Sequence, residues 1–237
     1  IIAVSSGKGG VGKSTVSANL ALALQQEGAK VGLLDADVYG PSQPTMLGIT
    51  DRPYSVDGKT LEPMIAHGLQ VASVGVLIDP DQPMIWRGPL AVSALQQLLK
   101  QTNWKDLDYL IVDMPPGTGD VPLTVFQSLP VNGIIIVTSP QELVSMIVEK
   151  AVNMAKKMNV PILGLVENMS YLECPDCGKK ISVFGESHID DVAKEYGIPV
   201  LAQIPIRPEI AKAVDEGTVE YVKADFLDQA VKAVEEA

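Results

Sequence analysis

Cysteine and histidine are rare in this sequence of 237 residues, which has two of each. Cys174 and Cys177 are too few for the disulfide framework of a small secreted protein. Neither His67 nor His188 has the spacing to this pair that a Cys₂His₂ zinc finger requires. We therefore expect a cytoplasmic protein whose cysteines have a role other than a structural disulfide.

Basic residues and long apolar runs are also scarce. Lys and Arg number 18 against 29 Asp and Glu, which gives a net charge of −11. This excess of negative charge opposes non-specific binding to nucleic acids and to anionic membranes. No apolar run reaches the roughly 18 residues of a membrane-spanning helix, and the acidic segment ADFLDQAVKAVEEA does not resemble a basic membrane anchor. We expect no nucleic-acid and no membrane partner.

What the chain does have is a regular alternation of short apolar runs and helical patterns. The predicted strands are Ile1–Val4, Val31–Leu34, Leu69–Val74, Tyr109–Val112, Gly133–Thr138, Ile162–Val166 and Val200–Ile204. The predicted helices are Lys13–Glu27, Leu90–Gln101, Val121–Ser128, Glu142–Met158, Ile189–Tyr196, Pro208–Glu216 and Ala224–Glu236. The strands are mostly continuous apolar runs, as expected of strands buried on both faces.

This alternation predicts the α/β class, with a doubly wound, mostly parallel sheet and helices on both faces. We expect one domain over residues 1–237, because no linker or repeat interrupts the pattern. The Asp57-Gly58 pair within SVDGKTLEP predicts a small hairpin insertion near residues 54–64.

Near the start of the chain lies a phosphate-binding motif, GxxxxGK[ST]. It is met by Gly7, Lys8, Gly9, Gly10, Val11, Gly12, Lys13 and Ser14. The motif follows a predicted strand and opens a predicted helix, which is the context it requires. The glycines let backbone amides close around phosphate oxygens, and the helix N-terminus favours an anion. We expect Lys13 to reach the β- and γ-phosphates, Ser14 to bind Mg²⁺ and Thr15 to contact the α-phosphate.

The same glycines also fit GxGxxG, the dinucleotide-binding pattern, and Asp35 lies where an acid that binds ribose would be. That alternative leaves Lys13 and Ser14 unexplained. It also does not predict the acid-Pro-Pro-Gly turn that follows a later strand, so the phosphate loop is favoured.

Acidic residues follow two of the predicted strands, where ligands bind in open α/β sheets. Asp35 and Asp37 follow one strand, and Asp113 follows another. We expect Asp113 to hold Mg²⁺ through water, Asp35 to support the ion and Asp37 to orient the attacking water. Gly117 would be free to donate its amide to the γ-phosphate. The alternative for each Asp is that its side chain only caps a helix or stabilises a turn. This alternative applies most strongly to the separate roles given to Asp35 and Asp37.

Lys8, in GKGGVGKST, resembles the second lysine of the deviant Walker A motif of the SIMIBI P-loop ATPases, which include MinD and ParA proteins. Further stretches narrow the resemblance: DADVYGPSQPTMLGI, WRGPLAVSALQQLL, DYLIVDMPPGTGD, VTSPQELV, GLVENMSYLECPDCGKKISVFG and IPIRPEI. From Ile2 to about Gly217, the chain resembles the Mrp/Nbp35 (ApbC-type) iron–sulfur cluster carrier ATPases.

This resemblance implies roles for particular residues. Lys8 would reach across a face-to-face homodimer to the partner's nucleotide and, with Lys13 and Asp37, would serve catalysis. Asn168 would read the adenine edge, and Pro205 and Arg207 would flank the base. No NKxD-type guanine reader is present, so ATP is expected over GTP. Asn168 as a turn residue and Pro205 as the end of a strand are the alternatives.

The cysteine pair is expected to form half of a metal site, in a predicted knuckle over residues 171–185. Thiolates bind zinc and iron–sulfur clusters, usually four to a site. A second copy related by a two-fold axis would supply the other thiols. The resemblance implies a [4Fe-4S] cluster bridged between subunits by Cys174 and Cys177. Structural Zn²⁺ in the same position, a redox CxxC and a spacing accident are the alternatives.

Together these features predict a slow ATPase that uses ATP and Mg²⁺ and carries a cluster to apo iron–sulfur proteins, with other cluster-assembly factors as further partners. One alternative is a ParA/MinD-like positioning switch with zinc at the dimer interface, which the acidic charge disfavours. The other is a redox ATPase like the nitrogenase iron protein, in which the cluster cysteines lie far apart in sequence.

Overall fold

The computed structural model describes residues 1–38, 40–76, 88–140 and 144–237. Its strands are β1 (Ile2–Ser6), β2 (Val31–Asp35), β3 (Met64–Ala66), β4 (Leu69–Ser73), β5 (Tyr109–Asp113), β6 (Gly133–Thr138), β7 (Ile162–Glu167), β8 (Leu172–Glu173), β9 (Lys180–Ile181) and β10 (Val200–Gln203). Its α-helices are α1 (Lys13–Gln26), α2 (Gln43–Met46), α3 (Gly88–Gln101), α4 (Asp120–Ser128), α5 (Val144–Met158), α6 (Ile189–Tyr196), α7 (Pro208–Glu216) and α8 (Asp228–Glu235).

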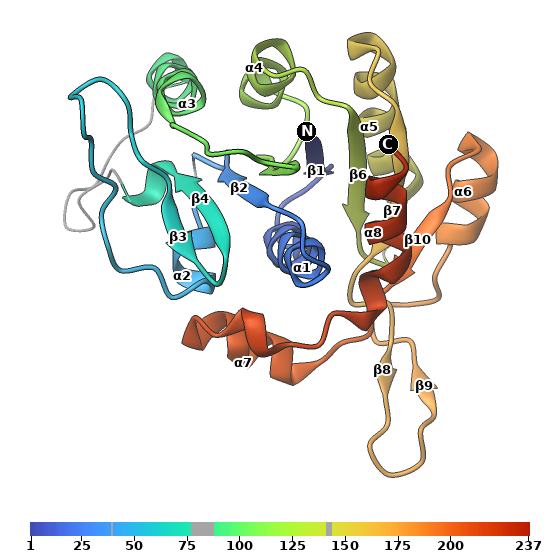
Figure 1. Cartoon of the computed structure of the whole chain (residues 1–237). Helices are drawn as coiled ribbons and strands as arrows, with labels where there is room; N and C mark the ends of the chain where they lie inside the picture. The colour runs from blue at the N-terminus through green and yellow to red at the C-terminus, as the bar shows by residue number, and fades with distance from the viewer. Residues whose placement is uncertain (39, 77–87, 141–143) are drawn as a thin grey trace.

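Eight of these strands form one sheet in the order β10-β7-β6-β1-β5-β2-β4-β3. Every neighbouring pair is parallel except β3 and β4. The sheet lies between helices on both sides (Figure 1). The predicted class, a doubly wound and mostly parallel α/β sheet, is confirmed.

Successive residues of the central strand β1 face different layers of helices. Ile2 and Val4 belong to a core that includes residues of α1 and α8. Ala3 belongs to a second core with residues of α3, α4, α5 and α6. Because successive side chains of a strand point to opposite faces, burial on both sides requires continuous apolar runs. This arrangement leaves the carboxyl ends of β1, β2, β5 and β7 along one edge of the sheet, where ligands bind in such folds.

The prediction of a hairpin near residues 54–64 is wrong. That segment is irregular, because the Asp57 carboxylate accepts the N–H groups of Lys59 and Thr60, at 2.8 and 2.7 Å, and so closes a local turn. The antiparallel hairpin is formed instead by β3 and β4. Its turn residues, His67 and Gly68, both have positive φ, 51° and 81°, as tight hairpin turns favour.

The other differences lie at element ends. Glu142, where we expected a helix to begin, lies outside the described residues, and α5 begins at Val144. The helix expected from Ala224 begins instead with a 3₁₀ turn at Asp225–Leu227. Among the described residues, no helix has both the length and the apolar character needed to cross a bilayer.

Candidate nucleotide and metal site

The phosphate loop connects β1 to α1 and depends on its glycines. Gly10 and Gly12 both have φ of +78°, which side chains other than glycine rarely adopt. A Cβ on Gly12 would come 2.1 Å from Nδ2 of Asn168, and one on Gly7 would come 2.1 Å from Cγ2 of Ile147. The loop therefore needs glycine both for its backbone angles and for the close approach of its neighbours.

A pocket of about 210 Å³ lies against this loop. It brings together the predicted phosphate-binding residues and one predicted catalytic acid, and its lining consists of Ser6, Lys8, Gly9, Gly10, Val11, Gly12, Lys13, Ser14, Thr15, Asp37, Ser42, Met46 and Pro116. Gly117 differs from the expectation, because its amide is not free: it donates to the carbonyl of Ser6 at 2.8 Å. A contact between Gly117 and a phosphate would require that hydrogen bond to break.

Lys13 is buried, with 6% of its side chain exposed, and its amine faces acids. Nζ lies 2.6 Å from Oδ1 of Asp113 and 4.0 Å from Oδ2 of Asp37. It also donates to the hydroxyl of Ser14 at 3.2 Å. The amine therefore lies beside the residues expected to hold Mg²⁺ and to orient water.

Asp35 and Asp113 are both fully buried and lie opposite each other in the β2–β5 register. Burial, and next the negative charge of Asp113, raise the pKa of Asp35 to about 7. The Asp35 carboxylate accepts hydrogen bonds from the amides of Asp37 and Gln43 and from the hydroxyl of Ser73. Two adjacent buried carboxylates are stabilised by a cation, and carboxylate and hydroxyl oxygens are ligands that Mg²⁺ prefers. The residues present therefore fit this ion.

Gln43, at the start of α2, is a site residue that the sequence analysis missed. It is fully buried, and its Nε2 donates to Oδ2 of Asp113 at 2.8 Å and to the carbonyl of Ser14 at 2.9 Å. Its Oε1 is buried and has no hydrogen-bond partner among the described residues. Such an acceptor suits a water or hydroxyl in a loaded site. The available signal was a polar residue shortly after two strand-end acids.

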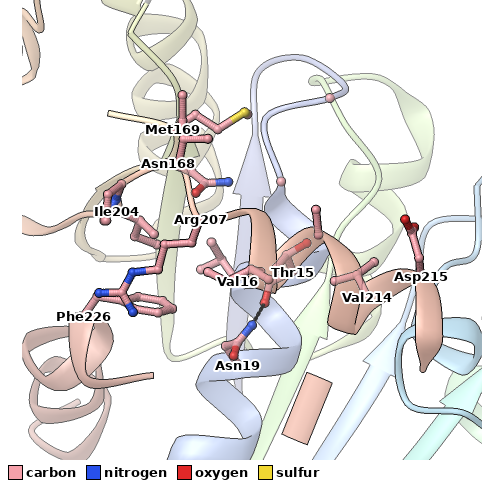
Figure 2. A pocket seen from close by; sticks show the side chains of 16 residues that line it. Thr15, Val16, Asn19, Asn168, Met169, Ile204, Arg207, Val214, Asp215 and Phe226 are labelled. Atoms are coloured by element: carbon pink, nitrogen blue, oxygen red, sulfur yellow. Dashed lines mark hydrogen bonds between the residues drawn. The ribbon is translucent and has the colours of Figure 1, made fainter. Parts of the chain in front are cut away.

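A second pocket, of about 350 Å³, adjoins the first and shares Gly10, Gly12 and Thr15 with it. Figure 2 shows its lining, in which Asn168 and Arg207 lie toward one end and Asp215 toward the other. The three residues expected at adenine, Asn168, Pro205 and Arg207, all line it. The pocket that contains the residues expected at the base thus continues into the pocket that contains those expected at the phosphates.

The second pocket is tied to the phosphate loop, and its lining includes residues that sequence reasoning did not find. Nδ2 of Asn168 donates to the carbonyl of Val11 at 3.0 Å, which ties the pocket to the phosphate loop. The guanidinium of Arg207 lies 5.2 Å from the centre of the Phe226 ring. Phe226 and Asp215 were missed because neither stands in a recognisable motif and both reach the pocket only through the fold.

The cysteine pair lies on the β8–β9 hairpin, which projects from the body of the molecule (Figure 1). The amide of Gly178, with φ of +69°, donates to the carbonyl of Cys174 and closes the turn. Cys177 is exposed and Cys174 is partly exposed. Hydrogen bonds from the amides of Asp176 and Cys177, and then from the Cys177 thiol, lower the pKa of Cys174. This favours the thiolate, the form that binds metals.

No group of three or more His, Cys, Asp or Glu side chains that could hold a metal occurs within the described residues. His67 lies elsewhere: one ring nitrogen is 3.1 Å from the carbonyl of Leu47 and the other is 3.4 Å from the carboxylate of Glu220. The chain therefore presents two thiols and no further ligand beside them in the described ranges.

A strand–glycine loop–helix unit, with buried acids at the ends of neighbouring strands, defines the class of P-loop nucleotide-binding domains. The family model described as "ParA: NUBPL iron-transfer P-loop NTPase" matches residues 1–237. The chain belongs to this family.

Curated relatives carry the name iron–sulfur cluster carrier protein. The one from Haemophilus influenzae is 52% identical over 233 residues, which are 97% of this chain and 63% of that protein. The one from Pseudomonas fragi is 53% identical over 219 residues, with 92% and 76% covered. The one from Escherichia coli K12 is 51% identical, with 92% and 59% covered. The chain thus spans about three fifths of the length of two of these relatives.

Solved structures support the same fold. A nucleotide-binding protein from Archaeoglobus fulgidus, in complex with ADP, superposes with a TM-score of 0.82 at 40% identity, over 96% of this chain and 90% of that one. The septum site-determining protein MinD from Pyrococcus horikoshii, complexed with Mg-ADP, has a TM-score of 0.67 at 23% identity, over 99% and 94%. The second likeness shows the fold alone.

Proposed function

We propose that residues 1–237 form a single cytoplasmic ATPase domain that carries a [4Fe-4S] cluster between two copies of the chain and delivers it to apo iron–sulfur proteins. The observation that carries the proposal is the pair Cys174, partly exposed, and Cys177, exposed, on a projecting hairpin close in sequence to Asn168 in the nucleotide pocket. The name shared by relatives at 51–53% identity supports it.

ATP fits the two adjoining pockets. The base would lie in the larger one, against Asn168 and Arg207, and the phosphates would lie over the glycine loop. Backbone amides and the N-terminus of α1 suit the phosphate charge. The apolar lining, including Phe226, suits a flat base.

Hydrolysis needs an oriented water and compensation for negative charge. Ser14, Asp35 and Asp113 would hold Mg²⁺, which neutralises charge on the phosphates when it is bound. In the proposed reaction, Asp37 orients the attacking water and Lys13 leaves Asp113 to contact the phosphates. Lys8, which also lines the phosphate pocket, contacts the nucleotide of the partner subunit. We expect slow turnover.

The cluster is cargo, and its release requires that the thiols be accessible. One chain supplies two thiols, while clusters of this kind have four cysteine ligands. Two hairpins meeting at a two-fold axis would complete the set. Zn²⁺ would fit the same four thiolates and is the competing occupant.

Anaerobic reconstitution with iron and sulfide tests the proposal. Wild-type protein should take up about four irons per dimer and develop the visible absorption of a cluster. Its mass in solution should become that of a dimer. Cys177→Ser should do none of these. Ser182→Ala, at an exposed residue just after β9, keeps both thiols, is the matched control and should load normally. Iron held by single subunits would contradict the shared site, and a preparation that binds zinc but never iron would favour a structural metal.

A further inference from the structure

Glu167, the last residue of β7, is a fully buried carboxylate between the nucleotide pocket and the cysteine hairpin. Its oxygens accept hydrogen bonds from the hydroxyl of Ser170 at 2.6 Å, from the hydroxyl of Ser187 at 2.8 Å and from Nε2 of Gln203 at 3.2 Å. Within the described ranges no Lys, Arg or His pairs with it. A buried carboxylate without a cation is costly unless several donors compensate for lost water, and here hydroxyls and an amide do so.

The two serines bracket the hairpin. Ser170 immediately precedes residues 171–186 and Ser187 immediately follows them. Cys174 and Cys177 lie inside this stretch, most of which is exposed. Both roots of the projecting hairpin are therefore bonded to one carboxylate, and the first root is also held by a bond from the amide of Ile206 to the carbonyl of Tyr171.

On its other side, Glu167 is joined to the nucleotide pocket. Asn168, the next residue, lines that pocket and donates to the carbonyl of Val11 in the phosphate loop. Met169, which also lines the pocket, has φ of 56° and makes the chain turn sharply toward Ser170. The amide of Ile204, a third lining residue, donates to the carbonyl of Glu167 at 2.8 Å. In Figure 2, Asn168, Met169 and Ile204 lie together at one end of the pocket.

We propose that Glu167 is a positioning residue that transmits occupancy of the nucleotide pocket to the cysteine pair. The inference rests on the proposed function and adds the physical link between its two sites. A base bound against Asn168 biases the turn that ends at Ser170. Because Ser170 and Ser187 share one carboxylate, a shift of this turn moves both roots of the hairpin together. The coupling is reciprocal, so metal on the hairpin changes nucleotide affinity by the same factor.

The test measures the rate at which an aromatic disulfide labels the cysteines, with and without a non-hydrolysable ATP analogue and Mg²⁺. In wild-type protein we expect the analogue to change the rate on the order of fivefold, the lower end of typical couplings. In Glu167→Gln the analogue should bind within about twofold of wild type, while the ratio of rates falls to about 1. Ser187→Ala should also reduce the ratio. Glu186→Gln changes an exposed neighbouring acid in the same way and should behave as wild type.

Retention of the wild-type ratio in Glu167→Gln would overturn the proposal, as would a wild-type protein that binds the analogue without any change in labelling. If wild-type protein binds no nucleotide, the proposed function fails instead. In that case, hydrogen exchange of peptides from residues 171–186 tests whether Glu167 anchors the hairpin. Exchange that is faster in Glu167→Gln than in wild-type protein supports the anchoring role, and unchanged exchange overturns it. Should thermal unfolding show that Glu167→Gln does not fold, the same measurements on Ser187→Ala decide.

Discussion

At the scale of single residues, the site holds an amine paired with acids, and the proposed function requires that pairing to change when nucleotide binds. The amine of Lys13 bonds to the fully buried Asp113 carboxylate and lies 4.0 Å from Asp37. A phosphate group would compete for that amine, since charge-assisted hydrogen bonds to an anion are the strongest available to it. In the proposed reaction, Lys13 therefore serves both the binding of nucleotide and the chemical step, whereas Asp37 serves the chemical step.

This difference separates two variants. We expect Lys13→Ala and Asp37→Ala both to lower turnover by about 10²-fold or more, the range for a lost catalytic group. Lys13→Ala should also weaken nucleotide binding by roughly 10- to 150-fold, because it removes a charged hydrogen bond of about 1.5–3 kcal/mol. Asp37→Ala should leave binding within about threefold, because its contact forms in the transition state. Phosphate release and the fluorescence of a labelled nucleotide measure the two effects.

Lys212→Ala, in which an exposed lysine is removed from α7, is the matched control and should change neither quantity. Normal hydrolysis by Asp37→Ala would show that another group orients the water. Because Lys13→Ala removes the amine that pairs with the buried Asp113 carboxylate, the unfolding transition of this variant should be measured together with its activity.

Asp35 makes stability depend on pH in a definite direction. Its pKa is about 7 in the folded protein, above its ordinary value of 3.8. Between these values the folded state binds more protons than the unfolded chain, so the free energy of unfolding falls as pH rises from about 4 to about 7. Three pKa units bound the loss at about 4 kcal/mol. Urea unfolding without Mg²⁺ at pH 5 and pH 8 should show about 3 kcal/mol of this loss, because about two of the pKa units lie between these pH values, and Asp35→Asn should show much less of it. Equal pH dependence in both proteins would contradict the assignment.

At the scale of elements, predictability followed the length of the apolar pattern. The central strands were predicted within a residue or two because short apolar runs rich in β-branched residues, such as Gly133–Thr138, are typical of strands buried on both faces. The phosphate loop was predicted because its chemistry is local in sequence. Helix α2 has four residues, and β8 and β9 have two each, too few for any periodicity to appear.

Other features were missed because they depend on tertiary contacts. Asp57-Gly58 resembled a hairpin turn, but the Asp57 side chain bonds to its own loop while His67-Gly68 makes the turn. The roles of Gln43 and Phe226 follow from elements far apart in sequence that meet at the site. A local pattern cannot report which distant side chain completes a pocket, and these residues therefore required the structure.

At the scale of the whole molecule, the proposed dimer brings together two chains with a net charge of −11 each. Close to the cysteines the charges balance, since Glu173 and Asp176 accompany Lys179 and Lys180. The charge of the whole molecule therefore dominates the approach of two copies. Like charges repel, and dissolved salt screens the repulsion over a Debye length of about 10 Å at 0.1 M.

The expected result is a dimer that salt strengthens. With zinc-loaded, nucleotide-free protein, the dissociation constant measured by analytical ultracentrifugation should fall on the order of tenfold between about 0.05 M and 0.3 M NaCl. Nucleotide is left out so that attraction between Lys8 and phosphate does not oppose the effect. Cys177→Ser should stay monomeric at every salt concentration, because each chain of this variant has only one of the two thiols needed for the shared metal site. A dissociation constant that rises with salt would mean that opposite charges meet across the interface, for example Lys179 or Lys180 of one subunit with acids of the other. In that case local charges on the hairpin, and not the charge of the whole molecule, would control assembly.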